Sequence, residues 1–455
     1  MLINLVDNRR YYLENEVNKD NENIFKISSL HFNILKNLPN PLTTDSLDGV
    51  EFLEQKNDES ETLVLKIVTN NNETYIQTGN MIGNFYFKAH QKIHQINIGL
   101  RFDDNDNNTI LEYLINYANT IYPKKIDLNT AQQNNKKSNN ITWIILAKMF
   151  SNSLSKAYVM GLPTYYESFE RSDYNVQGNI DINRLIAKEL PFKGITPYLI
   201  NERVIEKNIG SILLKAINMV EYKVRSFTIL SQIKTTLKQS NIKPIVTDIT
   251  LQKALNSRVL RNISYSEYNN SLKLALMIIQ GFKIPNFKNS NDIFYGYLTN
   301  ISKIWENYLV KLLAINFSDE WDIEVEPELK LFKYKPNLHK LKNVMYPDIV
   351  LKHKRDKKVI IFDAKFKNSQ WFNREDFYKT ATYISFYQNQ EDKYRVVLSG
   401  QIYPDKDADR INKNLGFLNS GIDFRILGID LMNEMIEKKE SDFINEIQKV
   451  TNEFK

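Results

Sequence analysis

The chain has 455 residues, which is too many for one compact core, so two or three domains are expected. Hydrophobic residues make up 42% and charged residues 25%, as in ordinary soluble proteins, and the net charge of +6 does not by itself indicate nucleic-acid binding. Cysteine is absent, which excludes disulfides, zinc–thiolate sites and thiol nucleophiles and favours a cytoplasmic location. Neither a signal peptide nor a membrane-spanning segment is expected, so no membrane partner is predicted.

Residues 1–130 are predicted to form a β-rich region. Strand-like patterns occur at 62–68, 73–78, 84–87 and 96–102, and a helix is expected at 109–118. A polar segment rich in Asn and Lys follows at 134–140. Such a composition is typical of a linker, so the first domain boundary is placed there.

The middle region, residues 141–290, is predicted to be mainly helical. Apolar residues recur at helical spacing in the segments 143–158, 209–224 and 272–279. Glycine and proline at 161–163 should end the first of these helices. The apolar faces are interpreted as core packing, not as cofactor sites.

The last region, residues 295–455, is predicted to be an α/β domain. Two β-prone segments, 345–351 and 359–366, flank a polar turn at 353–357 and are expected to pair as a hairpin. Helices are expected at 304–310, 375–383 and 432–450, with a further core strand at 396–404.

The hairpin would bring two acidic residues and a lysine together. Side chains alternate along a strand, so Asp363 and Lys365 point to the same face, and strand pairing brings Asp348 near Asp363. Two carboxylates facing one spot repel each other, and Mg²⁺, which prefers oxygen ligands, is the natural occupant. Such an ion supports phosphodiester cleavage, and the lysine can orient or deprotonate the attacking water. The alternative is a hairpin whose charges are simply solvated.

Pro347-Asp348, fourteen intervening residues and Asp363-Ala364-Lys365 resemble the motif of the PD-(D/E)XK nuclease superfamily. The resemblance implies a nuclease core built on a mixed sheet flanked by helices. It also implies that Asp348, Asp363 and the Ala364 carbonyl bind Mg²⁺, for which Mn²⁺ can substitute. Lys365 would then position the attacking water.

The same resemblance implies two further positions. Relatives place an acidic residue at the metal on the helix before the strands, and Glu306 matches it, unless it is an ordinary surface glutamate. On the helix after the strands, Lys379 stands where relatives carry Gln or Lys and could contact phosphate, unless it is simply solvated. Lys354 and Arg355 belong to a basic stretch, 330–367, with interleaved aromatic residues. They are DNA-contact candidates, and the alternative is a solvated hairpin surface.

A second set of motifs lies in the middle region. After the helix that ends at 161–163 comes a turn of the form x-G-x-x-D-x-x-R, with Gly178, Asp181 and Arg184. This turn resembles that of the McrC subunit of McrBC-type, modification-dependent restriction systems, including the LlaJI-like branch. A later segment, 206–215, departs from relatives because Ile209 replaces an arginine and the spacing is longer. The three turn residues either carry family function or simply fix the entry of a helix.

Relatives of this kind act with a separate AAA+ motor that is usually GTP-dependent. None of the fourteen glycines is followed by lysine, so the chain has no P-loop and nucleotide hydrolysis must come from a partner. The resemblance implies an McrB-like AAA+ GTPase or ATPase, docked by residues 1–130. Since one site cuts one strand, two copies of the chain are expected for double-strand cleavage.

These patterns predict a Mg²⁺-dependent DNA endonuclease subunit of an McrBC-like restriction system, active in antiviral defence, that also stimulates its AAA+ partner. Two alternatives remain open. The chain could be a non-cleaving activator of the partner NTPase, or a stand-alone repair or defence nuclease that needs no NTP.

Overall fold

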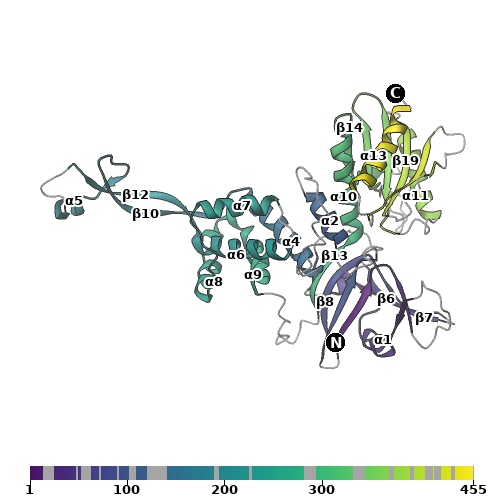
Figure 1. The fold of residues 1–455 in the computed structure, drawn as a ribbon, viewed down its shortest axis with the longest axis horizontal. Helices are drawn as coiled ribbons and strands as arrows, with labels where there is room; N and C mark the ends of the chain where they lie inside the picture. The colour runs from purple at the N-terminus through teal and green to yellow at the C-terminus, as the bar shows by residue number, and fades with distance from the viewer. Residues whose placement is uncertain are drawn as a thin grey trace. The chain divides into compact units, whose positions relative to one another are not determined.

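The computed structural model places the chain in two compact units. It describes all residues except 14–24, 48–49, 53–62, 71–72, 90–91, 102–108, 120–140, 189–193, 225–227, 281–293, 331–343, 368–373, 390–393, 405–412, 415–421, 432–435 and 454–455. The first unit combines residues 1–145 with 285–455, and the second is 146–284 (Figure 1). The chain therefore leaves the first unit and returns to it, and each unit is described by itself.

The N-terminal part of the first unit contains two five-stranded sheets that share one apolar core. The first has the order β1 (Leu2–Val6), β9 (Lys92–Gly99), β8 (Met81–Ala89), β13 (Phe294–Asn300), β5 (Val50–Phe52). The second has the order β3 (Phe25–Ile27), β2 (Arg10–Leu13), β7 (Glu73–Thr78), β6 (Leu63–Asn70), β4 (Leu42–Thr43). The short helices α1 (Ser29–Leu35) and η1 (Thr44–Ser46) join strands of this region. The predicted β-rich character is confirmed.

Strand β13 shows that this region is not built from one continuous stretch of sequence. Its residues pair antiparallel with β8 and parallel with β5, although more than 200 residues separate β13 from either strand. It leads directly into the helix α10 (Ile301–Phe317), whose first turn is capped by the Asn300 side chain on the Ser302 amide. The N-terminal sheet is therefore covalently joined to the C-terminal part of the unit.

The C-terminal part is a mixed six-stranded sheet with helices packed on it. Its order is β14 (Trp321–Val325), β17 (Ile349–His353), β18 (Lys358–Ala364), β19 (Arg395–Pro404), β21 (Asp423–Ile429), β20 (Lys413–Asn414). The pairs β14–β17, β17–β18 and β20–β21 are antiparallel, while β18–β19 and β19–β21 are parallel. The helices α10, α11 (Arg374–Asn389) and α13 (Ile436–Glu453) pack on strands of this sheet, and α2 (Thr109–Asn119) packs on α10. The mixed α/β architecture is confirmed.

The predicted hairpin is present, with Ile349 opposite Phe362 and Lys352 opposite Val359. The first strand is shorter than expected, because the predicted segment 345–351 is divided in two. Val344–Met345 forms β16 and pairs with β15 (Leu329–Lys330), whereas β17 begins only at Ile349. Pro347 lies in the interruption and has no N–H to donate to a ladder.

The second unit combines a helical bundle with a long antiparallel hairpin. The helices are α4 (Ile141–Tyr158), α6 (Lys207–Lys223), α7 (Thr228–Gln239), α8 (Asp248–Leu255), η3 (Arg258–Arg261), η4 (Ile263–Tyr265) and α9 (Tyr268–Gln280). The second unit begins at Leu146, within α4. The hairpin consists of β10 (Thr164–Asp173) and β12 (Thr196–Ile205), with β11 (Asn179–Ile180) and α5 (Ile182–Lys188) at its far end (Figure 1). This hairpin was not predicted, since its strands alternate mainly between partly buried and exposed positions, with only Pro197 and Tyr198 buried.

The far end of the hairpin is organised by the three motif residues. Gly178 lies so close to β12 that an added Cβ would come within 2.1 Å of the Leu199 carbonyl oxygen. Asp181 Oδ1 accepts a hydrogen bond from the Arg184 amide at 3.0 Å and so caps α5. The Arg184 guanidinium ties α5 to β10 through Glu170 at 2.8 Å. The interpretation of these residues as fixing a helix entry is confirmed.

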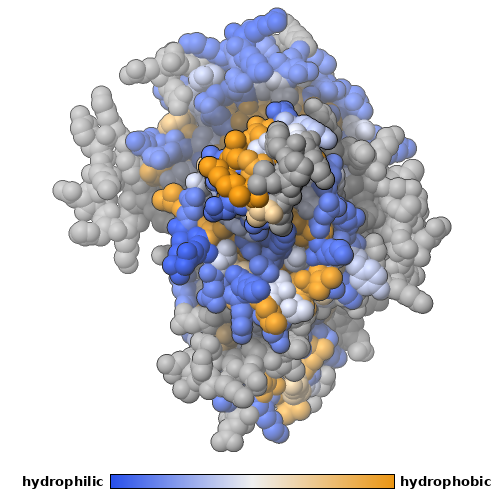
Figure 2. Space-filling model, turned by 90° about the vertical axis from the view of Figure 1, so that its left-hand side faces the viewer, coloured by the Kyte–Doolittle hydropathy of each residue, from blue (hydrophilic) through white to orange (hydrophobic). Residues whose placement is uncertain are grey.

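Apolar side chains are exposed at this far end. Ile180, Ile182, Ile186 and Leu199 are between 40% and 63% exposed. Figure 2, which turns the hairpin toward the viewer, shows apolar residues gathered there.

Among the residues that the structure describes, no helix is long and apolar enough to cross a membrane.

Candidate active site

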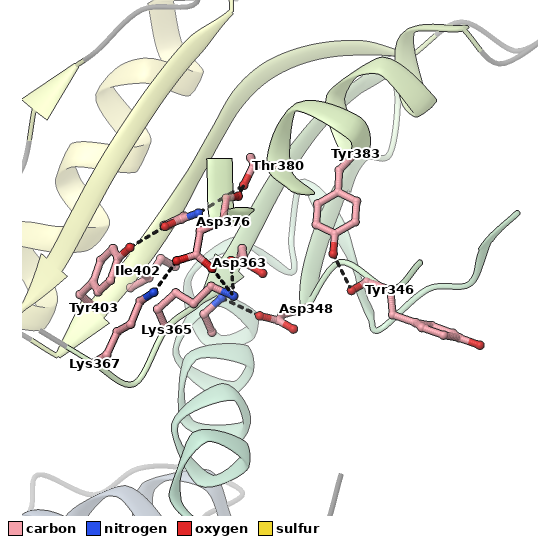
Figure 3. A network of polar contacts seen from close by, with 12 residues as sticks. Tyr346, Asp348, Asp363, Lys365, Lys367, Asp376, Thr380, Tyr383, Ile402 and Tyr403 are labelled. Atoms are coloured by element: carbon pink, nitrogen blue, oxygen red, sulfur yellow. Dashed lines mark hydrogen bonds and ion pairs between the residues drawn. The ribbon is translucent and has the colours of Figure 1, made fainter. Parts of the chain in front are cut away.

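Asp348 and Asp363 come together where β17 begins and β18 ends. Asp348 is 9% exposed and Asp363 is 3% exposed. The main-chain amide of Ala364 donates a hydrogen bond of 2.7 Å to Asp348 Oδ2 (Figure 3). The carboxylate of Asp348 is therefore held against the strand that carries Asp363. The hairpin brings the two acidic residues together as the sequence predicted.

Lys365 lies on the same side of the chain as Asp363. Its ammonium is 2.7 Å from Asp363 Oδ2 and 3.7 Å from Asp376 Oδ1. Burial acts to lower the pKa of Lys365, but Asp363, Asp348 and Asp376 outweigh it and raise this pKa well above its usual value. The charged ammonium form of Lys365 is therefore favoured in this arrangement.

Asp376 on α11 is a site residue that the sequence analysis did not single out. It is buried, and besides Lys365 it forms an ion pair with Lys367 (Figure 3). A sequence signal did exist. The buried residues of α11 recur at helical spacing from Asp376 through Thr380, Tyr383, Ile384 and Tyr387, so this carboxylate occupies a core position of the helix.

Glu306 is not an ordinary surface glutamate, so that alternative was wrong. It is 2% exposed and lies 3.3 Å from the Lys303 ammonium one helical turn earlier. Lys303 also pairs with Glu326 at 2.9 Å, and the Glu326 amide donates to the main-chain carbonyl of Asp348 at 3.1 Å. A short chain of polar contacts thus links α10 to the start of β17.

The three predicted DNA-contact residues are all exposed, on two different elements. Lys379 is exposed on α11, and Lys354 and Arg355 are exposed in the turn between β17 and β18. This turn is at the opposite end of the hairpin from Asp348, five strand residues or about 16 Å away. The structure does not bring Lys354 and Arg355 to the carboxylates. The basic residues at 331–343 fall outside the described part of the chain.

The donor set suits a hard divalent cation. Asp363 Oδ2 is buried and makes no hydrogen bond within the described structure, only the ion pair with Lys365. Carboxylate oxygens of this kind are preferred ligands of Mg²⁺. Within the described ranges no three His, Cys, Asp or Glu side chains already converge on one point. Completion of a coordination shell therefore requires main-chain oxygens, water or a substrate oxygen beside the two aspartates.

A buried ion pair from the N-terminal sheet contacts the chain directly after Lys365. Asp7 follows β1 and Arg101 follows β9, and their side chains are 0% and 3% exposed, with Nε 3.2 Å from Oδ2. The Arg101 guanidinium donates a hydrogen bond to the Phe366 carbonyl and lies 5.3 Å from the centre of the Phe366 ring. The end of β18 is thus fixed by residues from the other part of the unit.

Comparison with known families decides the relationship of this chain. A family model described as McrBC 5-methylcytosine restriction system component matches residues 76–404. The chain belongs to this family. The match runs from β7 to the end of β19 and includes both the hairpin of the second unit and the Asp348–Lys365 segment. The resemblance inferred from the sequence motifs is confirmed.

Two solved structures are similar to this chain. One chain of the refined half-complex from the tetradecameric assembly of Thermococcus gammatolerans McrB AAA+ hexamers with bound McrC is 14% identical, with a TM-score of 0.50. The similarity covers 99% of this chain and 100% of that chain. A second match, to the cryo-EM structure of the Thermococcus gammatolerans McrBC complex, has 14% identity and a TM-score of 0.27 and covers 70% of this chain and 88% of that chain. No curated protein matches.

Proposed function

We propose that this McrBC-family protein is the metal-dependent DNA endonuclease subunit of a restriction system. The observation that carries the proposal is the buried group of Asp348, Asp363 and Lys365 at one end of the β17–β18 hairpin. A solvated hairpin does not explain it, since the two carboxylates are almost fully buried. Burial of charge is costly unless the charge is paired or binds a metal, so this arrangement favours a functional role.

Asp348 and Asp363, with the Ala364 carbonyl as a further donor, would hold Mg²⁺ or Mn²⁺. Glu306 forms no three-carboxylate group with them within the described ranges and would stay outside the direct ligand set. When bound, such an ion lowers the pKa of a coordinated water and neutralises charge on the scissile phosphate. Asp348 is pre-oriented for this role by the Ala364 amide. Asp363 Oδ2 is buried and paired with the Lys365 ammonium at 2.7 Å, so Asp363 would bind the ion with Lys365 directly beside it.

Lys365 acts as a fixed ammonium. Its raised pKa keeps it protonated, so it donates hydrogen bonds to a water or to a phosphoryl oxygen and stabilises the negative charge that develops there. Asp363 and Asp376 hold it from two sides, at 2.7 and 3.7 Å. Lys367 pairs with Asp376 and limits the negative charge around Lys365.

An AAA+ partner completes the proposed system. The similar solved assembly contains McrB AAA+ hexamers with bound McrC, and the present chain has no P-loop of its own. Residues 1–130 remain one proposed docking region for a GTPase or ATPase of this kind. The exposed far end of the hairpin, with Ile182 63% and Ile186 60% exposed, is a second, because an apolar patch of this sort is typical of a protein contact.

Plasmid cleavage tests the proposal. Wild type and Asp363→Asn are compared in Mg²⁺ or Mn²⁺, each with and without the AAA+ partner and GTP or ATP. Asp356→Asn is the matched control, since it removes a carboxylate from the exposed turn of the same hairpin. We expect NTP-dependent cleavage by wild type and the control and none by Asp363→Asn.

Other outcomes separate the alternatives. Cleavage by the chain alone, without partner or NTP, favours a stand-alone nuclease. Equal stimulation of the partner NTPase by wild type and Asp363→Asn, without any cleavage, refutes the nuclease role and favours a non-cleaving activator.

A further inference from the structure

The net positive charge of the chain lies entirely in the helical bundle of the second unit. Residues 207–280 contain 11 Lys and Arg but only 3 Asp and Glu. The remaining 381 residues contain 49 Lys and Arg and 51 Asp and Glu. The excess of +6 therefore reflects one segment that is strongly basic and a remainder that is slightly acidic. Segregation of this kind is typical of a surface that meets a polyanion.

Helix α6 presents part of this charge to solvent. Its core-facing side is a continuous row of buried residues that includes Ile209, Leu213 and Val220. Lys215 and Tyr222 lie on the opposite side, and Tyr222 is 73% exposed. The two residues are seven positions apart, two helical turns, so they share one face of the helix.

A shallow cavity lies against this face. It has a volume of about 230 Å³ and is lined by Lys215, Asn218, Met219, Tyr222, Lys223 and Pro244. Lys223 lies over the Tyr222 ring, with its ammonium 5.6 Å from the ring centre. Lys243 precedes Pro244 and is exposed. The acidic residue of this helix, Glu221, forms an ion pair with Lys234 of α7, so its charge is compensated.

We propose that this α6 groove, which we define as the six lining residues together with Lys243, binds the phosphate backbone of DNA. The inference rests on the proposed function, because the DNA is the substrate cut at Asp348 and Asp363. The wall of the cavity is mostly apolar, so the phosphate contacts come from its rim, where the lysine ammonium groups and the exposed Tyr222 hydroxyl are groups that proteins use to contact phosphates. None of them reads bases here, so the groove contributes affinity and placement without sequence preference.

Fluorescence anisotropy with a labelled 30-base-pair duplex tests this inference on the full chain. The buffer contains Ca²⁺ in place of Mg²⁺ and no partner. The groove variant is Lys215→Gln/Lys223→Gln/Lys243→Gln. The control, Lys26→Gln/Lys88→Gln/Lys92→Gln, removes the same charge from exposed lysines of the first unit. A third variant replaces the three groove lysines by arginine and keeps the charge.

We expect the groove variant to raise the Kd at least tenfold. It should also lower the dependence of log K on log salt concentration by about 2 to 3, since each lost phosphate contact removes about 0.9. The control and the arginine variant should stay within about twofold of wild type. Circular dichroism of the groove variant should match wild type, because its substituted side chains are not in the core.

Three results overturn the inference: no DNA binding by wild type, equal loss in the groove variant and the control, or unchanged DNA affinity in the groove variant with lost binding of the AAA+ partner. The last result would assign the groove to a protein. The outcome is separable from that of the proposed nuclease. Groove-dependent binding by a chain that never cleaves supports the groove and refutes only the nuclease role.

Discussion

Replacement of Arg101 by Met tests how strongly the N-terminal sheet supports the active-site strand. In the native chain the Arg101 guanidinium pairs with buried Asp7 and donates to the Phe366 carbonyl, one residue after Lys365. The substitution leaves the Asp7 carboxylate buried without its cation. Loss of one partner of such a pair costs about 3–5 kcal/mol of unfolding free energy. For a unit of this size the melting temperature should fall by about 5–8 °C.

The pH dependence of this loss provides an internal check. Burial raises the pKa of Asp7, and the charge of Arg101 is the largest influence that lowers it. Without Arg101 the folded-state pKa rises further above the unfolded value. The folded variant then binds a proton more tightly than the unfolded chain, so its stability increases as pH falls through the folded-state pKa. We therefore expect a smaller deficit at pH 5 than at pH 8.

The assay is thermal unfolding of wild type, Arg101→Met and Asp7→Asn/Arg101→Met at both pH values, followed by cleavage assays on each. The double variant should recover much of the lost stability, because neither charge is left alone. A single variant that loses less than about 1 kcal/mol, or a double variant no more stable than the single, refutes the reasoning. Normal cleavage by a folded Arg101→Met chain would show that Arg101, through the Phe366 carbonyl, is not needed to position Lys365.

Three further outcomes are expected. Asp376→Asn should lower the cleavage rate about 10- to 100-fold without weakening DNA binding, because Lys365 loses one of its two anchors. Burial raises the pKa of Glu440, so the stability that its protonated form contributes is lost as pH rises through that pKa. Glu440→Gln should therefore reduce the dependence of the melting temperature on pH. Gly178→Ala should disorder the hairpin end, because its Cβ would strike the Leu199 carbonyl, and raise proteolysis there with the bundle unaffected.

The sequence determined those features that depend on nearby residues. Alternation along 359–366 and the intervening turn were enough to predict the β17–β18 pair and the meeting of Asp348 with Asp363. Helical spacing predicted α6 and α9, since burial of one face leaves a local periodic pattern. The family motifs, which occupy short segments, were recognisable for the same reason.

Only the tertiary structure decided which distant segments meet. Nothing local to 294–300 shows that β13 pairs with β8, or that Arg101 reaches Phe366. Glu306 carries a charge that suggests a surface, and only the packing of α10 on the sheet buries it. The β10–β12 hairpin was not predicted because its strands alternate mainly between partly buried and exposed positions and contribute only Pro197 and Tyr198 as buried residues, which leaves a weak pattern in the sequence. Periodicity reports burial within one element, whereas the partner that buries it is set by the whole chain.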